Sequence, residues 1–201
     1  MRLGVFGGAF NPVHNGHINL AKSFITSLKL DLLFIVPTAD PPHRQSADFA
    51  PPQDRFNMLV AAFSNVEKAV VSDMEFRRIG KSYTYDTVQE LKAEYPGADI
   101  YLLLGEDQLL KFEEWYRYRD ILKDVTLCAA ARGENSRKLL AEFSAVRFGK
   151  EKVIIADFEP IVVSSSEIRD KIKNNFDISG LVPQCVLDYI MEKGLYRDRL
   201  W

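Results

Sequence analysis

Short, continuous apolar runs alternate along the chain with longer stretches in which apolar residues recur every three or four positions. The runs are rich in Val, Ile and Leu, which is typical of strands covered on both faces of a sheet. We therefore predict buried strands at residues 3–6, 32–36, 69–71, 100–104, 125–131 and 153–155. The stretches with a helical apolar stripe predict helices at residues 17–28, 53–63, 84–95 and 136–146.

Strand–helix alternation at this spacing predicts an α/β fold: a Rossmann-like, mostly parallel sheet with helices on both faces. Two further short helices, 167–173 and 183–192, follow the last strand. We expect one domain over residues 1–201, with 164–201 as a C-terminal helical part packed on the sheet. Residues 37–52 hold five of the nine prolines and predict an irregular excursion. Ligands in such folds bind beyond the carboxyl ends of the strands.

Composition limits the classes of partner. The chain has 26 Lys+Arg against 28 Asp+Glu, a net charge of -2, which argues against nucleic acid or an anionic membrane as the main partner. No apolar run approaches a membrane span or a signal peptide, so we expect a cytoplasmic protein. Cys128 and Cys185 lie far apart and outside any Cys-x-x-Cys pair, and Cys128 is expected in the core. The sequence leaves a homo-oligomer open.

The first predicted strand ends in Gly7 and Gly8, and a helix should begin near Asn15 or Gly16. Glycines at this point let the backbone approach a ligand closely, and a helix N-terminus presents free N–H groups to phosphate. His14 and His17 are three residues apart on one face of that helix, and they are two of only three histidines. This predicts a phosphate site; the alternatives, two incidental histidines or a zinc site, lack support.

A second group of residues lies near the C-terminus, where three serines (164–166) precede Glu167 and Arg169. Taken alone, the serines indicate an ordinary helix cap. The functional alternative is that the serine hydroxyls and backbone amides bind phosphate and that Arg169 pairs with the same anion.

Together, GGAFNPVHNGH (7–17) and VSSSEIR (163–169) resemble the nucleotidyltransferases of the HxGH type. The segments between and after them resemble bacterial nicotinate-mononucleotide adenylyltransferases: PTADPPHR, SYTYDT, LLLGEDQLLKFEEWYR and LVPQCVLDYIMEKGLY. The resemblance covers nearly the whole chain, in order. Its first motif more often reads GGTFDP, so Ala9 and Asn11 depart from the pattern; Arg44 stands where lysine is common, and Ser166 replaces a threonine.

The resemblance implies transfer of AMP from ATP to nicotinate mononucleotide, with release of pyrophosphate, in NAD biosynthesis. Mg²⁺ would be carried on the nucleotide phosphates without side-chain ligands. The implied catalytic residues are His14, His17 and Arg169. The implied ATP-binding residues are Gly7, Gly8, Ala9, Phe10, Gly16, Ser164, Ser165 and Arg169.

The implied mononucleotide-binding residues are His43, Arg44, Thr84, Tyr85, Asp107, Trp115 and Arg132. Asp107 would accept from the ribose hydroxyls, Trp115 would stack on the pyridine ring, and amides near Thr84 and Tyr85 would take the carboxylate. The plainer interpretation of Trp115 is an aromatic within an aromatic-rich helix, and His43, Arg44 and Arg132 could equally be solvated surface residues.

Three alternatives remain open. A related adenylyltransferase, acting on phosphopantetheine or on nicotinamide mononucleotide, would share the two terminal motifs. A nucleotide-binding regulator without catalysis would not need His14, His17 and Arg169 together, and a purely structural module would not need the clustered glycines. The candidate positive groups, His14, His17, Arg44, Arg132 and Arg169, are scattered and meet only if the chain folds as predicted.

Overall fold

The computed structural model describes residues 1–40, 49–131, 133–156, 158 and 161–197. Its six strands are all parallel and form one sheet in the order β3-β2-β1-β4-β5-β6. They are β1 (Arg2–Gly8), β2 (Leu32–Pro37), β3 (Ala69–Val71), β4 (Asp99–Gly105), β5 (Val125–Ala130) and β6 (Val153–Ala156). The strand order reverses between β1 and β4, which is where ligands bind in doubly wound folds. The predicted Rossmann-like α/β class is confirmed.

The helices connect and cover the strands. They are α1 (Asn15–Ser27), α2 (Pro52–Phe63), α3 (Thr84–Glu94), α4 (Glu106–Leu110), α5 (Tyr118–Asp124), α6 (Glu134–Arg147), α7 (Ser165–Lys173) and α8 (Gln184–Lys193), with short 3₁₀ turns η1 (Phe112–Glu114) and η2 (Lys150–Lys152). Alternate residues of each central strand enter two cores. Val5 packs in the core that includes residues of α3 to α6, whereas Phe6 packs in the core formed with α1, α2, α7 and α8.

The two edge strands differ from the prediction of strands buried on both faces. Val70 in β3 is 48% exposed, and the first three residues of β6 are only half-buried. Both strands have a neighbour on one side only, so the helices cover them incompletely. Cys128, in the more central β5, is fully buried as predicted.

The segment after β4 also differs from the sequence interpretation. No aromatic-rich helix contains Trp115, because η1 ends at Glu114 and α5 begins only at Tyr118. Arg117 lies between them with a φ of 55°, a left-handed conformation that a continuous right-handed helix excludes. The excursion predicted for residues 37–52 begins with Pro37 at the end of β2 and ends with Pro52 at the start of α2; residues 41–48 lie outside the described part.

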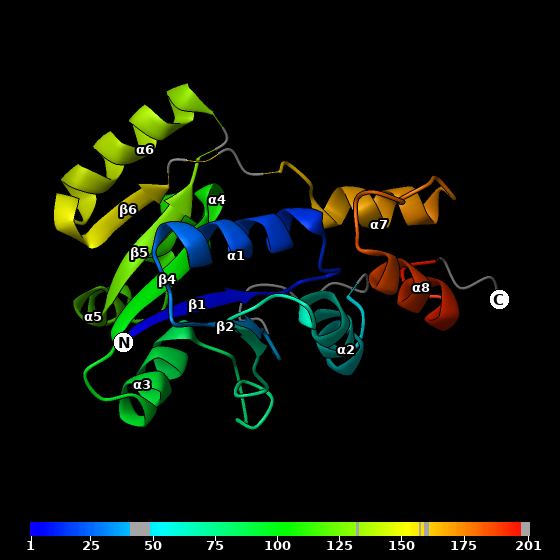
Figure 1. The fold of residues 1–201 in the computed structure, drawn as a ribbon, viewed down its shortest axis with the longest axis horizontal. Coiled ribbons are helices and arrows are strands. Elements are labelled where there is room, and N and C mark those ends of the chain that lie inside the picture. Colours follow the sequence, from blue (N-terminus) through cyan, green and yellow to red (C-terminus); the bar gives the residue numbers. More distant parts are fainter. Residues whose placement is uncertain (41–48, 132, 157, 159–160, 198–201) are drawn as a thin grey trace.

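Helices α7 and α8 bring the C-terminal motif to the end of the first strand. Their apolar side chains, among them Ile168 and Val186, join the same core as those of α1 and α2. The hydroxyl of Tyr189 in α8 donates to Asp54 of α2 (2.8 Å) and accepts from Asn57 (3.0 Å). In Figure 1, β1 runs from the N-terminus toward α7 and α8, at the end of the molecule where the C-terminus lies.

Candidate functional site

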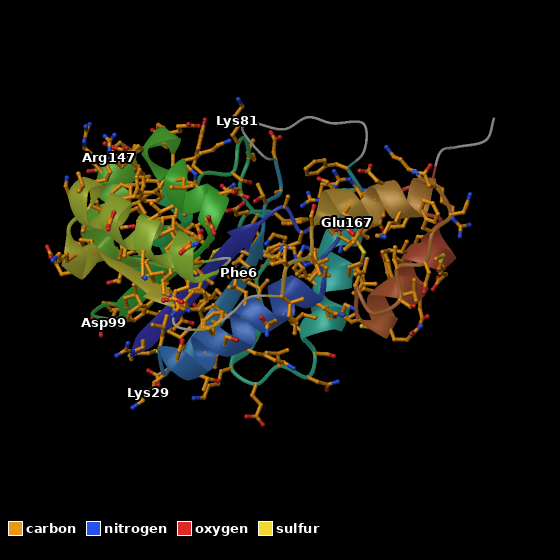
Figure 2. The ribbon with its side chains drawn as sticks, turned by 90° about the horizontal axis from the view of Figure 1, so that it is seen from above. Phe6, Lys29, Lys81, Asp99, Arg147 and Glu167 are labelled. Carbon is orange, nitrogen blue, oxygen red and sulfur yellow. The ribbon has the colours of Figure 1, made fainter. Side chains whose placement is uncertain are left out.

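The two central strands both end in glycines at the edge of the sheet. Gly7 and Gly105 are exposed, although the strand residues just before them, Phe6 and Leu104, are buried. Register between β1 and β4 holds as far as Phe6 and Leu103. The strands therefore leave an accessible backbone where the strand order reverses. Figure 2 shows Asp99 and Lys29 at one end of the molecule and Glu167 on the other side of Phe6, toward this edge.

His14 and His17 form a stacked pair at the start of α1, which begins at Asn15 as predicted. His14 is the N-cap, and its backbone N–H donates to Nδ1 of His17 (3.2 Å). The ring centroids lie 3.6 Å apart with an interplanar angle of 24°. Because Nδ1 of His17 accepts a hydrogen bond, the proton of the neutral ring lies on Nε2. His17 can therefore offer Nε2–H to an anion.

Both imidazoles are neutral at pH 7 in the free protein. Burial lowers the pKa of His14 from 6.5 to about 4. The pKa of His17 is also well below 6.5, because of burial first and of the neighbouring His14 second. The sequence interpretation that counted these histidines among the positive groups is wrong for this state. The physical reason is that two stacked, desolvated rings disfavour a charge on either one.

The ring of Phe10 packs against His17 of the histidine pair. Its ring packs edge-on against Phe6 (5.3 Å) and against His17 (4.9 Å), and it is 2% exposed. The backbone of Phe10 has a φ of 47°. A Cβ on Gly8 would lie 3.3 Å from the Phe10 ring, so Gly8 makes room for it. The Phe10 side chain thus packs in the core, and only its backbone remains for the ATP contact expected from the sequence.

Gly16 makes room inside the protein as well. A Cβ at this position would lie 2.8 Å from the carbonyl oxygen of Ile161 and 3.1 Å from Nδ1 of His14. The backbone N–H of Ile161 donates to the side chain of Asn19 in α1 (3.3 Å). The segment after β6 therefore lies directly against the first turn of α1, and Gly16 allows this close approach.

The C-terminal serines and Arg169 contact the first motif directly. The hydroxyl of Ser165 donates to the carbonyl oxygen of Pro12 (2.9 Å), and Nη1 of Arg169 donates to the carbonyl oxygen of Asn11 (2.8 Å). Ser164 is the N-cap of α7, and its hydroxyl accepts from the N–H of Glu167 (3.3 Å). The serines therefore cap α7, and the same helix start also contacts the first motif.

Asn11, which departs from the common motif, is a buried junction. It is 2% exposed, and its Oδ1 accepts from the N–H of Ala50 (3.0 Å) and from the hydroxyl of Tyr196 (2.9 Å). Burial raises the pKa of Tyr196, so its phenol stays protonated and remains a donor. The side chain of Asn11 therefore joins the first motif to the segment before α2 and to the residues just after α8.

Thr84 and Tyr85, two of the expected mononucleotide-binding residues, lie at the start of α3. Tyr85 contacts residues 116–117, which directly follow a third expected residue, Trp115. Thr84 is the first residue of α3, and the ring of Tyr85 lies 3.9 Å from the guanidinium carbon of Arg117. The ring of Tyr116 packs on that of Tyr83, with centroids 4.5 Å apart, and edge-on to that of Tyr85, with centroids 6.3 Å apart.

The neighbouring Trp115 packs on Phe112 (5.4 Å). Asp107 is exposed in the first turn of α4, just beyond β4 and at the same edge of the sheet. His43, Arg44 and Arg132 lie outside the described residues.

Sequence reasoning missed two buried charged residues, Arg55 and Glu75. Arg55 is 1% exposed and Glu75 is 6% exposed. Burial lowers the pKa of Arg55, and the nearby Tyr196 and Glu75 act against that shift. Arg55 lies in a regular amphipathic helix, where an arginine normally faces solvent, so no local pattern marks it.

Two kinds of feature are absent from the described part of the chain. None of its helices is long and apolar enough to cross a membrane. Among the same residues, no three His, Cys, Asp or Glu side chains gather closely enough to hold a metal ion. The side chains of His17 and Arg169 present N–H donors, which suit an anionic ligand.

The chain is similar to known proteins over nearly its whole length. Residues 5–171 match the cytidylyltransferase-like family. A protein of Carboxydothermus hydrogenoformans named "probable nicotinate-nucleotide adenylyltransferase" is 37% identical over 200 residues, covering 98% of each chain. A Thermotoga maritima protein of the same name is 37% identical over 189 residues, covering 91% of this chain and 87% of the relative.

Among solved structures, the Plasmodium falciparum nicotinic acid mononucleotide adenylyltransferase complexed with NaAD superposes with a TM-score of 0.80. It is 21% identical and covers 97% of each chain, a likeness that bears on the fold alone. The sequence relatives decide the family, because their identity extends over nearly the full length of both chains. The chain belongs to the cytidylyltransferase-like family and, within it, to the nicotinate-nucleotide adenylyltransferases.

Proposed function

We propose that this chain transfers the AMP group of ATP to the phosphate of nicotinate mononucleotide, giving nicotinate adenine dinucleotide and pyrophosphate. The observation that carries the proposal is the meeting of two distant motifs at one edge of the sheet. Arg169 and Ser165 of α7 contact Asn11 and Pro12, in the loop that leads to the His14–His17 pair. An anion at this edge would face histidine, arginine and helix N-terminal donors together.

The reaction needs no protein nucleophile. The phosphate of the mononucleotide is already largely dianionic near pH 7, since the second pKa of a phosphate monoester is about 6. It attacks the α-phosphorus of ATP, the bond from that phosphorus to the bridging oxygen breaks, and pyrophosphate leaves. The protein has to hold two anions in line and stabilise the charge that develops on the α-phosphoryl oxygens.

We assign the ATP half of the site to the residues at the end of β1 and the start of α7. His17 donates from Nε2 to an α-phosphate oxygen, and the buried His14 holds His17 through its backbone N–H. Arg169 binds the β and γ phosphates together with Ser165, which uses its backbone N–H at the start of α7 because its hydroxyl already donates to Pro12. The backbones of Gly7, Gly8, Ala9, Phe10 and Gly16, with Ser164, line the nucleotide.

We assign the mononucleotide half to the carboxyl end of β4 and the start of α3. Asp107 accepts hydrogen bonds from the ribose diol, and Trp115 offers a face to the pyridine ring. The free N–H groups at Thr84 and Tyr85 favour a carboxylate, because a helix N-terminus carries partial positive charge and a neutral amide offers no charge to it. His43, Arg44 and Arg132 complete the set assigned from the sequence.

The donor set fits Mg²⁺ that arrives on the nucleotide. Imidazole N–H, hydroxyl and guanidinium groups match phosphate oxygens, and within the described residues no carboxylate cluster competes for the ion. When bound, the ion would neutralise charge on the leaving pyrophosphate. We further infer one nucleotidyltransferase domain over 1–201, in a cytoplasmic protein that binds no nucleic acid and no membrane.

A turnover assay tests the proposal. Purified protein receives ATP and Mg²⁺ with nicotinate mononucleotide, nicotinamide mononucleotide or phosphopantetheine, and pyrophosphate release is measured. We expect release with the nicotinate substrate and a kcat/KM for it well above that for the amide. Release with phosphopantetheine alone would reassign the substrate, and no release with any of them would leave a nucleotide-binding regulator.

A further inference from the structure

The side chain of Arg55 crosses between the loops that follow β1 and β2. From the first turn of α2 it donates to the carbonyl oxygens of Ala9 (2.8 Å), Thr38 (2.8 Å), Ala39 (3.4 Å) and Ala50 (3.3 Å). Ala9 lies in the glycine-rich loop assigned to ATP, whereas residues 38–40 follow β2. One buried guanidinium therefore fixes the position of the ATP loop relative to residues 38–40.

The other end of the 38–40 segment is attached to the start of α3. The N–H of Ser82 donates to the carbonyl oxygen of Asp40 (3.0 Å), and the N–H of Asp40 donates to the hydroxyl of Ser82 (3.2 Å). Ser82 is 9% exposed and precedes Thr84 and Tyr85, which are assigned to the mononucleotide. The segment thus has a hydrogen-bonded partner on each side.

A buried carboxylate supports the α3 side of this segment. Glu75, 6% exposed, accepts from the hydroxyl of Thr87 in α3 (3.0 Å) and lies 3.8 Å from Arg78. Burial raises the pKa of Glu75, and the hydrogen bond from Thr87 and the nearby Arg78 act against the shift. Glu75 thus supports the start of α3, to which residues 38–40 are bonded through Ser82.

We propose that Arg55 is a positioning residue that couples the two substrate half-sites through residues 38–40. It touches neither substrate. Its guanidinium group binds the ATP loop at Ala9. The same group binds residues 38–40, whose backbone is bonded to Ser82 just before α3. A shift at either end is transmitted to the other, because four hydrogen bonds to one rigid, planar group leave little independent movement. This inference rests on the proposed function.

The first test is Arg55→Lys. Lysine keeps the charge but lacks the planar fork that bridges several carbonyls. We expect KM to rise about tenfold for ATP and for the mononucleotide alike, the size of losing one good buried hydrogen bond, with a smaller fall in kcat. Arg147→Lys is the matched control, since Arg147 is exposed on α6 and its KM values should equal those of wild type.

The second test changes the mononucleotide side of the 38–40 segment. Ser82→Ala removes the hydroxyl that accepts from Asp40, far along the chain from the ATP loop. Coupling predicts that this change raises KM for ATP as well as KM for the mononucleotide. Ser144→Ala is the matched control, because Ser144 is a buried serine of α6 (3% exposed) whose hydroxyl has no hydrogen-bond partner.

The outcomes separate this inference from the proposed function. Wild-type turnover decides the function by itself. If wild type is active and Arg55→Lys changes KM for only one of the two substrates, or for neither, coupling through Arg55 is wrong. If Arg55→Lys does not fold, Ser82→Ala decides: an unchanged KM for ATP overturns the inference, and a raised one supports it.

Discussion

Nη1 of Arg169 donates a hydrogen bond of 2.8 Å to the backbone carbonyl oxygen of Asn11, although 158 residues separate them in sequence. The hydroxyl of Ser165 likewise donates to the backbone carbonyl oxygen of Pro12 (2.9 Å). A guanidinium has five donors, more than the contacts to Asn11 and Ser166 use, so Arg169 can be anchored and still bind an anion. The loop after β1 thus sets the place from which Arg169 acts.

Asn11→Ala should destabilise the protein by about 2–6 kcal/mol. The change removes the buried oxygen that accepts from Ala50 and Tyr196, and each buried donor left unpaired costs about 1–3 kcal/mol. Urea unfolding measures the effect. Asn174→Ala is the control: its amide bonds to Asp170 at the surface, so we expect a change within about 0.5 kcal/mol. Equal losses in both variants would contradict the buried role of Asn11.

Gly16→Ala should also destabilise the protein, by about 1–3 kcal/mol. Alanine normally favours a helix over glycine by about 1 kcal/mol, but here its Cβ would lie 2.8 Å from the carbonyl oxygen of Ile161. The clash with backbone outweighs the propensity. Gly105→Ala serves as the control in the same unfolding experiment, because its φ is -73° and an added Cβ there meets nothing within 4 Å. A Gly16→Ala protein as stable as wild type would show that the Ile161 segment moves away easily.

The repetitive features of the fold were predictable from sequence. Continuous apolar runs located all six strands, and the helix start at Asn15 followed from the glycines and histidines around it. Contacts between distant segments left no local pattern. Nothing near Gly16 points to Ile161, and the arginine at position 55 resembles any arginine on an amphipathic helix. The break at Arg117 was missed because a non-glycine residue with positive φ has no sequence signature.

Contact between the two terminal motifs was predictable from the sequence, but the protonation state of the two histidines was not. The two motifs at 7–17 and 163–169 meet because the chain after β6 crosses back to the start of α1. The neutral state of His14 and His17 depends on their stacking and burial, and neither property follows from a three-residue spacing. The assigned substrate contacts remain predictions.

His17→Ala should lower kcat by about 10²–10³, the effect of losing one donor that stabilises transition-state charge. Because His17 acts as a neutral Nε2–H donor, His17→Asn, which keeps a neutral N–H group, should retain more activity than His17→Ala. Steady-state kinetics at saturating substrates measures both variants. A His17→Ala enzyme with near wild-type kcat excludes this role. Equal loss in the two variants would instead point to ring stacking as the essential property.

Acid should destabilise the protein through His14. Its pKa is about 4 when folded and 6.5 when unfolded, so between these values the unfolded chain binds more protons. Stability from this group is therefore complete above pH 6.5 and is lost as pH falls toward 4, by about 3 kcal/mol in all. His17 acts in the same direction, whereas Glu75, with its raised pKa, acts in the opposite one.

The difference between wild type and His14→Gln isolates this contribution. Glutamine does not titrate, and the other groups remain in both proteins, so the free energy of unfolding of wild type should fall more steeply between pH 6.5 and 4. Urea unfolding at several pH values in this window gives both slopes. Parallel slopes would mean that His14 is protonated in the folded protein as easily as in the unfolded chain. Burial would then not be what keeps the His14 ring neutral, and the lowered folded pKa of His14 would be wrong.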